Sequence, residues 1–434
     1  MTRLERGTGA GPSRREFARM LALGGPAALW ARAALARAPV DARPLPPEPI
    51  AHDESYWEAV RAQFPLPREV AALNAANLCP SPRPVIEALY NDSDLDHDLS
   101  PANRRRMHEG KEATRARLAA FLRVTPDEIV LTRNTSEANN LVSSGLDLGP
   151  GDEVVVFSDN HASNREAWRE KARRRAYTVR EMQVVQPHPG EDHYLEAADR
   201  ALTSRVRLLA FTHLTNSVGD LFPAAELCRL ARGRGVLTLV DGAQSFGLMD
   251  LDLGRMQPDF YTGSAHKWLC GPKEAGVLYV RRDVQDRLWP SIVSLYPGET
   301  GLSRTFEGFG QRDEPALAAF GAAADFQVRI GRPGIERRAR ELAAAFKEGL
   351  RGLPGVRLWT HPDPARSHAV VSFQPGGLDP EKLALALYDS DRIVCAARTG
   401  ADRPGLRFSP HFFNLHAEVE RALAALRRTL ARGL

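Results

Sequence analysis

Short apolar runs alternate with stretches of helical hydrophobic spacing from about residue 70 onward. Helical spacing is found, for example, at Asn164–Arg175 and Ala224–Arg232. Strands that alternate with helices are typical of a mainly parallel sheet covered by helices. The pattern therefore predicts an α/β fold. We predict strands at the apolar runs Ile129–Thr132, Glu153–Phe157, Arg207–Thr212, Val236–Val240 and Gly276–Val280.

Beyond residue 315 the pattern changes. A long helical stretch at Gly334–Arg351 precedes shorter strands around Ala369–Phe373 and Leu406–Ser409, and a terminal helix follows. Such a mixture is typical of a second, smaller α+β domain. We predict an N-terminal segment at 39–70, a large domain at 71–315 and a small C-terminal domain at 316–434.

The first 38 residues differ from the rest. The pair Arg14-Arg15 precedes a short apolar stretch, and Ala34-Leu35-Ala36 forms an A-x-A site. This order resembles a twin-arginine (Tat) export signal, which implies transport by the Tat machinery, cleavage near residues 36–38 and a periplasmic or secreted protein. The apolar stretch is too short for a stable membrane anchor. The alternative is an arginine-rich tail on a cytoplasmic enzyme.

Composition narrows the classes of partner. The 434 residues carry a formal charge of +4, and residues 1–38 hold seven arginines against two glutamates, so the remainder is close to neutral. A neutral body gives no electrostatic reason to expect nucleic acid. Four cysteines occur without a C-x-x-C pair, so we expect neither a metal site nor a disulfide framework.

Two motifs stand out, and the first of them follows a predicted strand. Asp241-Gly242-Ala243-Gln244 comes directly after one apolar run, and Ser264-Ala265-His266-Lys267 lies farther along, followed by a G-P-x-x-x-G string at Gly271–Gly276. In α/β sheets, ligands bind beyond the carboxyl ends of the strands, so Asp241 is expected to point into the ligand site. The acidic residue and the lysine are candidates for chemistry, although either one alone could be a helix cap or a surface side chain.

Together the motifs resemble those of class V pyridoxal 5′-phosphate (PLP) enzymes, a family with cysteine desulfurases and isopenicillin N epimerase-like proteins. The resemblance implies PLP fold type I, in which the large domain holds a mainly parallel seven-stranded sheet. It implies that Lys267 forms the Schiff base with PLP and that Asp241 faces the ring nitrogen. Gln244 would contact the ring hydroxyl. PLP is an electron sink only while its ring nitrogen is protonated, which explains the need for a carboxylate.

A helix opens directly after the first predicted strand, at Asn134-Thr135-Ser136. Amide groups at a helix N-terminus and nearby hydroxyls suit a phosphate dianion. Asn134 or Thr135 could equally cap the helix. The family resemblance implies phosphate contacts from Thr135 and Ser136, and further contacts from Ser264 and His266.

Two more segments at strand ends match the family. His161 follows the strand Glu153–Phe157, and the resemblance implies that it stacks on the PLP ring. A lone histidine is more often a core or surface residue. Asn216 follows the strand Arg207–Thr212 and would reach the ring oxygen. We therefore predict Lys267, His161 and Asp241 as catalytic residues.

Candidate substrate-binding residues come from two segments, one in the N-terminal and one in the C-terminal part of the chain. The segment Asn74–Pro80 resembles the family's N-terminal loop, which makes Asn77 a candidate for substrate contact. Arg407 lies in a string that resembles the family's R-x-S-P-H segment. A guanidinium binds a carboxylate through two hydrogen bonds, so we expect Arg407 to hold the substrate's α-carboxylate, with Arg398 as the second candidate. The alternative for Arg407 is a structural ion pair.

Two departures from the family pattern bear on function. Gln311 stands where many members carry a threonine that reaches the phosphate of the neighbouring subunit, and the expected homodimer rests on the resemblance alone. Desulfurases carry a cysteine just after R-T-G, but no cysteine follows Arg398-Thr399-Gly400. Cys395 is expected to be buried, and Cys270 to serve packing.

These observations predict transamination or epimerisation of an amino acid or a peptide-like amino compound. Cysteine desulfuration or another C–S lyase activity is an alternative. A non-catalytic protein on the same scaffold is a second one.

Overall fold

The computed structural model describes residues 53–93, 98–400 and 402–434, all within one unit of the chain, Leu45–Leu434. The expected Tat signal and its cleavage site lie outside these residues. In the part that is described, no helix combines the length and the apolar character that crossing a membrane requires.

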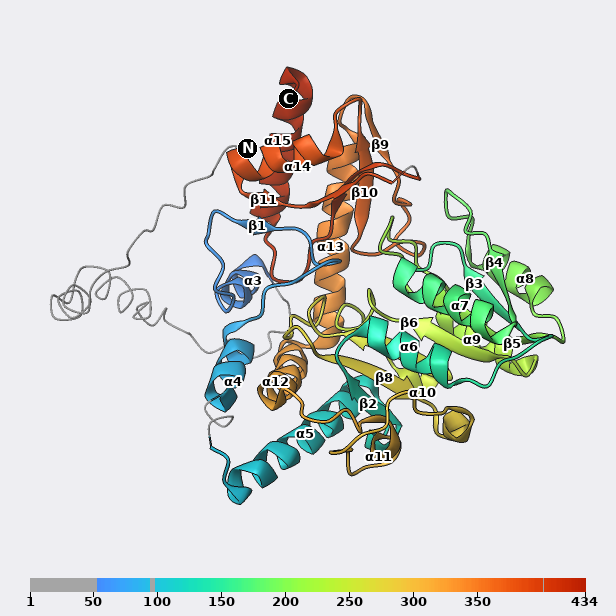
Figure 1. Ribbon diagram of the computed structural model, residues 1–434. Coiled ribbons are helices and arrows are strands. Elements are labelled where there is room, and N and C mark those ends of the chain that lie inside the picture. The colour runs from blue at the N-terminus through green and yellow to red at the C-terminus, as the bar shows by residue number, and fades with distance from the viewer. Residues whose placement is uncertain (1–52, 94–97, 401) are drawn as a thin grey trace, which may run out of the picture. The chain divides into compact units, whose positions relative to one another are not determined.

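The largest sheet has seven strands in the order β2-β8-β7-β6-β5-β3-β4 (Figure 1). β8 runs antiparallel to both of its neighbours, and the other pairs are parallel. The predicted mainly parallel, seven-stranded sheet is therefore confirmed. Its strands are β2 (Ile129–Thr132), β3 (Glu153–Phe157), β4 (Thr178–Met182), β5 (Val206–Thr212), β6 (Leu237–Asp241), β7 (Phe260–Ser264) and β8 (Gly276–Val280).

Three of the predicted strands match residue for residue, whereas β4 and β7 were not predicted. β4 is an edge strand with several exposed polar residues, so its sequence contains no apolar run. β7 is buried along its whole length, yet it carries Thr262, Gly263 and Ser264. Polar residues are tolerated there because the strand leads into the site described below. β6 extends one residue further than expected and ends on Asp241.

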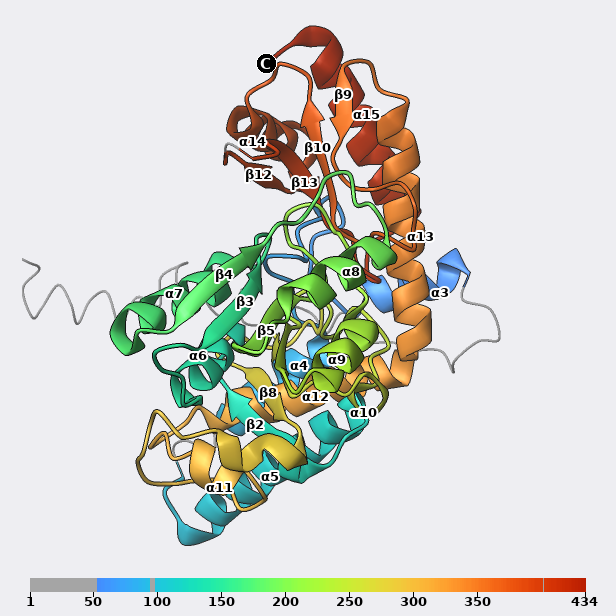
Figure 2. The same ribbon diagram turned by 90° about the vertical axis from the view of Figure 1, so that its right-hand side faces the viewer.

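Helices cover both faces of this sheet (Figure 2). Strands covered on both sides read as continuous apolar runs, which is why the sequence pattern located them. Short elements connect the layers: η2 (Pro126–Glu128), α10 (Leu253–Met256), η3 (Arg282–Arg287) and α11 (Ser303–Phe306). One face packs against α5 (Pro101–Leu122), α8 (Glu191–Ala201), α9 (Ala224–Gly233) and α12 (Glu314–Ile330), and the other against α6 (Thr135–Gly145) and α7 (Ala162–Arg175). α4 (Arg83–Ser93) packs on α12.

The C-terminal part forms a four-stranded antiparallel sheet in the order β12-β13-β10-β9. The predicted strands and terminal helix are present, and β9 and β12 are additional. The strands are β9 (Val356–Leu358), β10 (Val371–Pro375), β12 (Ala396–Arg398) and β13 (Gly405–Phe408). The helices that pack here are α13 (Arg332–Arg351), α14 (Pro380–Asp391) and α15 (His416–Arg432). The proposed domain limits, 71–315 and 316–434, stay a prediction.

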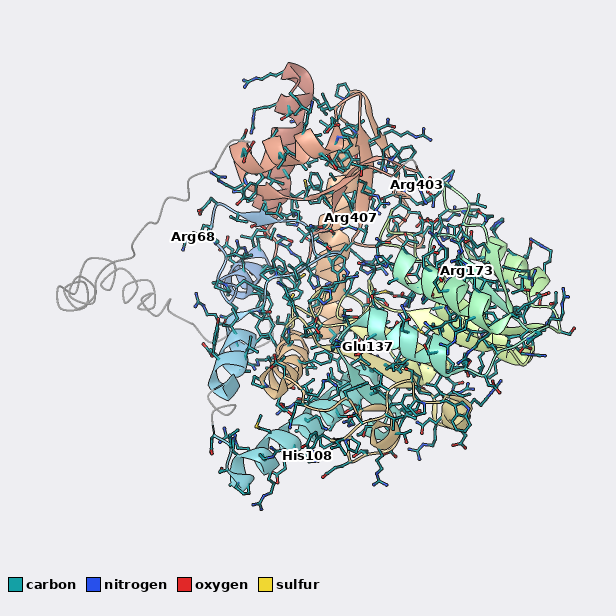
Figure 3. The ribbon with its side chains drawn as sticks, viewed as in Figure 1. Arg68, His108, Glu137, Arg173, Arg403 and Arg407 are labelled. Carbon is teal, nitrogen blue, oxygen red and sulfur yellow. The ribbon has the colours of Figure 1, made fainter. Side chains whose placement is uncertain are left out.

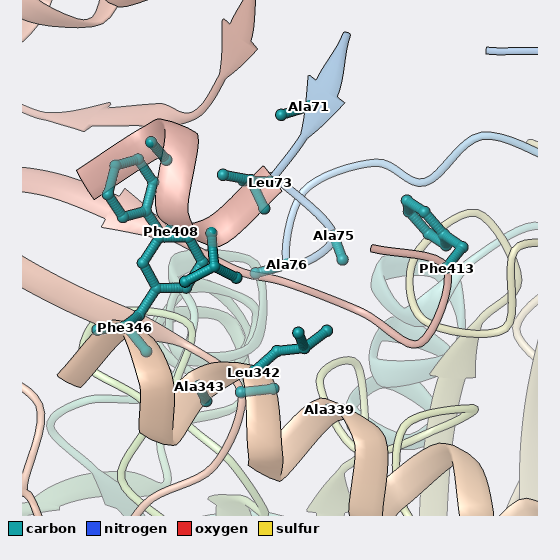
Figure 4. Close-up of a cluster of buried hydrophobic side chains, with 14 of the residues drawn as sticks. Ala71, Leu73, Ala75, Ala76, Ala339, Leu342, Ala343, Phe346, Phe408 and Phe413 are labelled. Carbon is teal, nitrogen blue, oxygen red and sulfur yellow. The ribbon is translucent and has the colours of Figure 1, made fainter. Parts of the chain in front are cut away.

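The N-terminal segment packs into this C-terminal core. β1 (Ala71–Ala72) pairs in parallel with β11 (Ile393–Val394), and α3 (Glu54–Arg61) buries Tyr56 and Trp57 in the same cluster. Figure 4 shows Leu73 from this segment near Phe346 of α13 and Phe408 of β13. Residues more than 300 positions apart in the sequence therefore share one hydrophobic core.

Two buried histidines lie next to strands, His213 after a strand of the large sheet and His368 before a strand of the small sheet. His213 follows β5, and His368 precedes β10 and donates its backbone N–H to the carbonyl of Gly219. Burial, reinforced by the neighbouring histidine or arginine charges, lowers the pKa of each imidazole to about 4. Both rings are therefore neutral in the folded protein at neutral pH.

We predict that acid destabilises the fold between about pH 6.5 and pH 4. The unfolded chain binds protons near pH 6.5, whereas the folded chain resists them until about pH 4, so stability is complete above this window and falls as the pH falls through it. Thermal unfolding at a series of pH values measures the effect. The variant His213→Gln should lose part of this slope. An unchanged slope would contradict the assignment.

Candidate active site

A pocket lies at the carboxyl ends of β3, β5, β6 and β7, beside the start of α6. It brings together most of the residues that the sequence singled out. Its lining comprises Asn134, Thr135, Ser136, His161, Ser163, Thr212, Asn216, Asp241, Ala243, Gln244, Ser264, His266 and Lys267. The residues that were predicted to bind a cofactor therefore lie together at strand ends, which is where ligands bind in α/β sheets.

The carboxylate of Asp241 is buried and fully engaged. Its Oδ2 accepts hydrogen bonds from the side-chain amides of Asn139 (2.9 Å) and Asn164 (3.3 Å), and its Oδ1 accepts one from the backbone N–H of Ala243 (3.1 Å). Asn139 is itself oriented by Thr262, whose hydroxyl donates to Asn139 Oδ1 at 3.0 Å. Both oxygens of the carboxylate therefore have hydrogen-bond donors. Sequence analysis assigned no function to Asn139 or Asn164.

Lys267 lies close to this carboxylate. Burial lowers the pKa of its ammonium group, the charge of Asp241 raises it, and Arg407 lowers it again. The net direction is downward, which favours the neutral amine that a Schiff base requires. The sequence therefore selected a lysine whose surroundings suit a nucleophile.

The loop that carries Lys267 is anchored from the C-terminal part of the chain. The backbone carbonyl of the next residue, Trp268, accepts hydrogen bonds from His411 Nε2 (2.5 Å) and Gln327 Nε2 (2.7 Å). The indole N–H of Trp268 donates to Gln244 Oε1 at 2.7 Å, and Gln244 Nε2 donates to the carbonyl of Ala76 at 3.0 Å. Gln244 thus lines the pocket in a fixed orientation and ties it to the N-terminal segment.

The start of α6 forms an anion cradle. Asn134 caps the helix by accepting a hydrogen bond from the backbone N–H of Glu137, so the capping alternative is correct for this residue. The hydroxyl of Ser264 lies 2.8 Å from both the backbone nitrogen and the hydroxyl of Thr135. His266 also lines the pocket, and burial next to Lys267 lowers its pKa to about 4. The helix N-terminus and these polar groups suit a phosphate.

Gly276, the last residue of the G-P-x-x-x-G string, lets this cradle form. A Cβ atom at Gly276 would lie 2.7 Å from the Cα atom of Asn134 and 2.8 Å from the carbonyl oxygen of Gly263. Both contacts are shorter than real Cβ atoms allow. The string therefore fixes a close approach between β8 and the start of α6.

His161 occupies the N-cap position of α7. Its Nδ1 accepts a hydrogen bond from the backbone N–H of Ser163 at 3.2 Å and lies 2.8 Å from the Ser163 hydroxyl. Partial burial lowers its pKa, and the charge of Lys267 lowers it further. A neutral ring held in the pocket wall is suited to packing against a planar ligand. Asn216, in the turn that follows β5, also lines the pocket.

Arg407 and Arg398 form a cationic pair on the small sheet (Figure 3 labels Arg407). Arg407 is buried and donates to the carbonyl of Asn216 (2.8 Å) and to Asn74 Oδ1 (3.0 Å). Burial, followed by the charge of Arg398, lowers its pKa to about 10. Among the described residues neither guanidinium forms an ion pair, and the Nε atom of each is buried without a partner. A structural ion pair therefore does not explain Arg407.

Four expectations lie outside the pocket. Arg398 and Arg407 do not line it, although Arg407 contacts Asn216, which does. Asn77 is exposed, and it is Asn74 that contacts Arg407. Gln311 is exposed as well, so its contact with a neighbouring subunit stays a prediction. No cluster of acidic, histidine or cysteine side chains in the described chain could hold a metal ion.

The cysteine expectations need one correction. Cys270 is buried in the apolar core, as predicted. Cys395, which lies between β11 and β12, is only partly buried.

Comparison with known proteins identifies the family. The sequence model of the family described as aminotransferase class-V matches residues 82–421. The chain belongs to this family. The isopenicillin N epimerase of Amycolatopsis lactamdurans is 36% identical over 389 residues, covering 86% of this chain and 98% of that protein. A probable cysteine desulfurase of Methanothermobacter thermautotrophicus is 31% identical over 84% of this chain and 95% of that protein.

A solved structure supports the cofactor. A C-DES mutant with glycine covalently linked to its PLP cofactor superimposes with a TM-score of 0.78 at 26% identity, covering 85% of this chain and 98% of that one. The chain therefore has the PLP fold type I and is a PLP-dependent enzyme, which sets aside the non-catalytic alternative. The residues of the pocket fit PLP, because a carboxylate, a lysine of lowered pKa and an anion cradle line it together.

We predict that Ser264→Ala weakens PLP binding about tenfold or more, because a hydrogen bond to a charged group is lost from the cradle. Titration of the cofactor-free enzyme with PLP, followed by absorbance, measures this. Affinity for pyridoxal, which lacks the phosphate, should change little. Ser143→Ala, which removes a buried serine hydroxyl of α6 outside the pocket, is the control. Equal losses for PLP and pyridoxal would contradict a phosphate contact.

Proposed function

We propose that this enzyme moves the Cα proton of an amino acid or a peptide-like amino compound, as an epimerase or, with a 2-oxo acid product, as an aminotransferase. Epimerisation is favoured by the 36% identity with isopenicillin N epimerase across nearly the whole of both proteins. The observation that carries the proposal is the pairing of a buried lysine of lowered pKa with two guanidinium groups that lack anionic partners.

PLP would supply the electron sink for the pair of electrons left at Cα. Lys267 Nζ accepts the Cα proton and returns it, which is work suited to an amine of lowered pKa. Asp241, which is held by its three donors, would face the ring nitrogen of PLP. His161 would cover the ring, Gln244 and Asn216 would contact its oxygen, and the residues at the start of α6 would hold the phosphate. Arg407, aided by Arg398, binds the substrate carboxylate.

Cysteine desulfuration or C–S cleavage is the second candidate, and it is supported by relatives and structures of that class. The positions of the cysteine thiols argue against this activity. None of the four cysteines lines the pocket. Burial raises the pKa of Cys395 to about 12, so its thiol is protonated at neutral pH and is a poor nucleophile.

We predict that the holoenzyme exchanges the Cα hydrogen of its substrate with D₂O and inverts the configuration. A panel of L- and D-amino acids and short peptides, followed by NMR and chiral separation, tests this. Lys267→Ala should slow the exchange about 10²- to 10⁴-fold, which is the usual effect of losing a general base. The same samples report 2-oxo acid and sulfide. Sulfide release from cysteine that outpaces Cα exchange would overturn the proposal in favour of desulfuration.

We also propose a homodimer. The segment from Trp289 to Tyr296 exposes several large apolar side chains, and Val293 is 83% exposed. Such a patch on a soluble protein commonly marks a contact surface. The backbone N–H of Gly310 donates to the carbonyl of Leu295 at 3.1 Å, which places the exposed Gln311 beside this patch. A partner on the patch would therefore meet Gln311.

Export by the Tat route is proposed from the sequence of residues 1–38. We predict that a reporter fused to residues 1–45 is exported and that changing both Arg14 and Arg15 to lysine abolishes its export, because the pathway reads the arginine pair. Fractionation of cells into periplasm and cytoplasm measures the outcome. A reporter that stays in the cytoplasm with the unchanged sequence would show that these residues are only a tail.

A further inference from the structure

The antiparallel strands β12 and β13 carry the cationic pair, and residues 402–404, called the turn below, lead directly into β13. Ala396 pairs with Arg407 and Arg398 with Gly405 across these strands. Side chains two positions apart on a strand point to the same face, so Arg398 and Arg407 lie diagonally on one face of the sheet. The turn therefore adjoins the strand that carries Arg407 and pairs with the strand of Arg398.

One residue of the turn is bound to Asp159, which lies two residues before the pocket-lining His161. Arg403 Nη1 lies 2.9 Å from Asp159 Oδ2, and its Nη2 donates to Asp159 Oδ1 at 3.0 Å. Both side chains are nearly buried, with 9% and 8% exposed. The guanidinium thus faces both carboxylate oxygens, through one hydrogen bond and one ion contact, and such an arrangement is directional. Figure 3 labels Arg403 at this junction between the small sheet and the large one.

The backbone of the turn agrees with a fixed position. Arg403 has a φ of 56°, which costs free energy in any residue other than glycine. The neighbouring carbonyl of Pro404 accepts a hydrogen bond from the indole of Trp359 at 2.9 Å. The turn is thus held at two adjacent residues.

Asp159 is itself a rigid anchor, because its neighbour Asn160 is tied to β5. Asn160 Nδ2 donates to the carbonyl of Ala210, and Asn160 Oδ1 accepts from the backbone N–H of Thr212, both at 2.9 Å. His161, two residues after Asp159, lines the pocket. Ser217, next to Asn216, adds a hydroxyl contact to Asp159 at 3.3 Å. The Arg403–Asp159 pair therefore connects the turn to the His161 and Asn216 sides of the pocket.

The pair also determines which cation Asp159 neutralises. Arg398 is close enough to Asp159 and Arg403 for both charges to act on it, yet Asp159 gives both oxygens to Arg403. Arg398 is left with a buried Nε atom that has no partner. Without Arg403, the carboxylate of Asp159, whose charge already acts on Arg398 more strongly than that of Asp402, would lose its partner and would compete with a substrate carboxylate for Arg398.

We propose that Arg403 is a positioning residue for substrate binding. Its ion pair with Asp159 holds the turn at residues 402–404 against the segment that leads from β3 to His161, and it keeps Arg398 free for the carboxylate of the substrate. The inference rests on the proposed function only in taking a carboxylate-bearing amine as the ligand.

The test compares glycine with methylamine, two amines that differ by a carboxylate. Each is titrated into the holoenzyme, and the cofactor's absorbance reports binding. Arg403→Ala should weaken glycine binding at least tenfold and leave methylamine binding within about twofold of the wild type, a free-energy difference of about 1.4 kcal/mol. Arg403→Lys, which keeps one charge but not the bidentate geometry, should fall between. Arg428→Ala, which removes an arginine–aspartate pair on α15, is the matched control.

A second measurement is independent of the reaction. Limited trypsin digestion should cut after Arg398 faster in Arg403→Ala and in Asp159→Asn than in the wild type, because the turn is released. Glycine binding unchanged in Arg403→Ala, or glycine and methylamine weakened alike, would overturn the proposal. If the wild type's absorbance responds to neither amine, the proposed function fails, and unchanged digestion in both variants still overturns the positioning role of Arg403.

Discussion

The buried carboxylate of Asp241 is the constraint on which the site depends. A charge in the interior is tolerated only where donors surround it. Two of those donors, Asn139 and Asn164, come from α6 and α7, which pack on the same face of the sheet. The third is the backbone of Ala243, in the turn that follows β6. Satisfying Asp241 therefore fixes the relation of two helices and a strand, and with it the places of His161 and the start of α6.

A second set of contacts extends this order to the far end of the chain. These contacts converge on the backbone carbonyl of Trp268, which accepts hydrogen bonds from His411, in the segment after β13, and from Gln327 of α12. Lys267 is thus held by groups that lie 60 to 144 residues beyond it. The same C-terminal part supplies Arg407 and the turn with Arg403, so cofactor chemistry and substrate binding share one scaffold.

The sequence predicted local features, such as strands and motifs, better than contacts between residues that are distant in the sequence. Predicted strand ends singled out Asp241 and Thr135, because a motif and the apolar run before it are read together, whereas Lys267 was singled out by its motif alone. Asn139 and Asn164 were missed, since an asparagine inside a helix carries no local sign of its partner. The Arg403–Asp159 pair joins residues 244 positions apart and is visible only once the sheets are placed. β7 was not predicted as a strand because polar residues near the pocket interrupt its apolar pattern.

The pairing of β1 with β11 has a consequence for how the protein is made. Ala71 finds its partner Ile393 only after more than three hundred further residues have left the ribosome. The core that β1 joins also needs α15, the last helix of the chain. Folding of this region is therefore completed only after translation, and β1 stays without its strand partner throughout synthesis. Any step of synthesis that loses the last residues of the chain would thus also leave residues 71–72, near the other end of the described chain, without their place in the core.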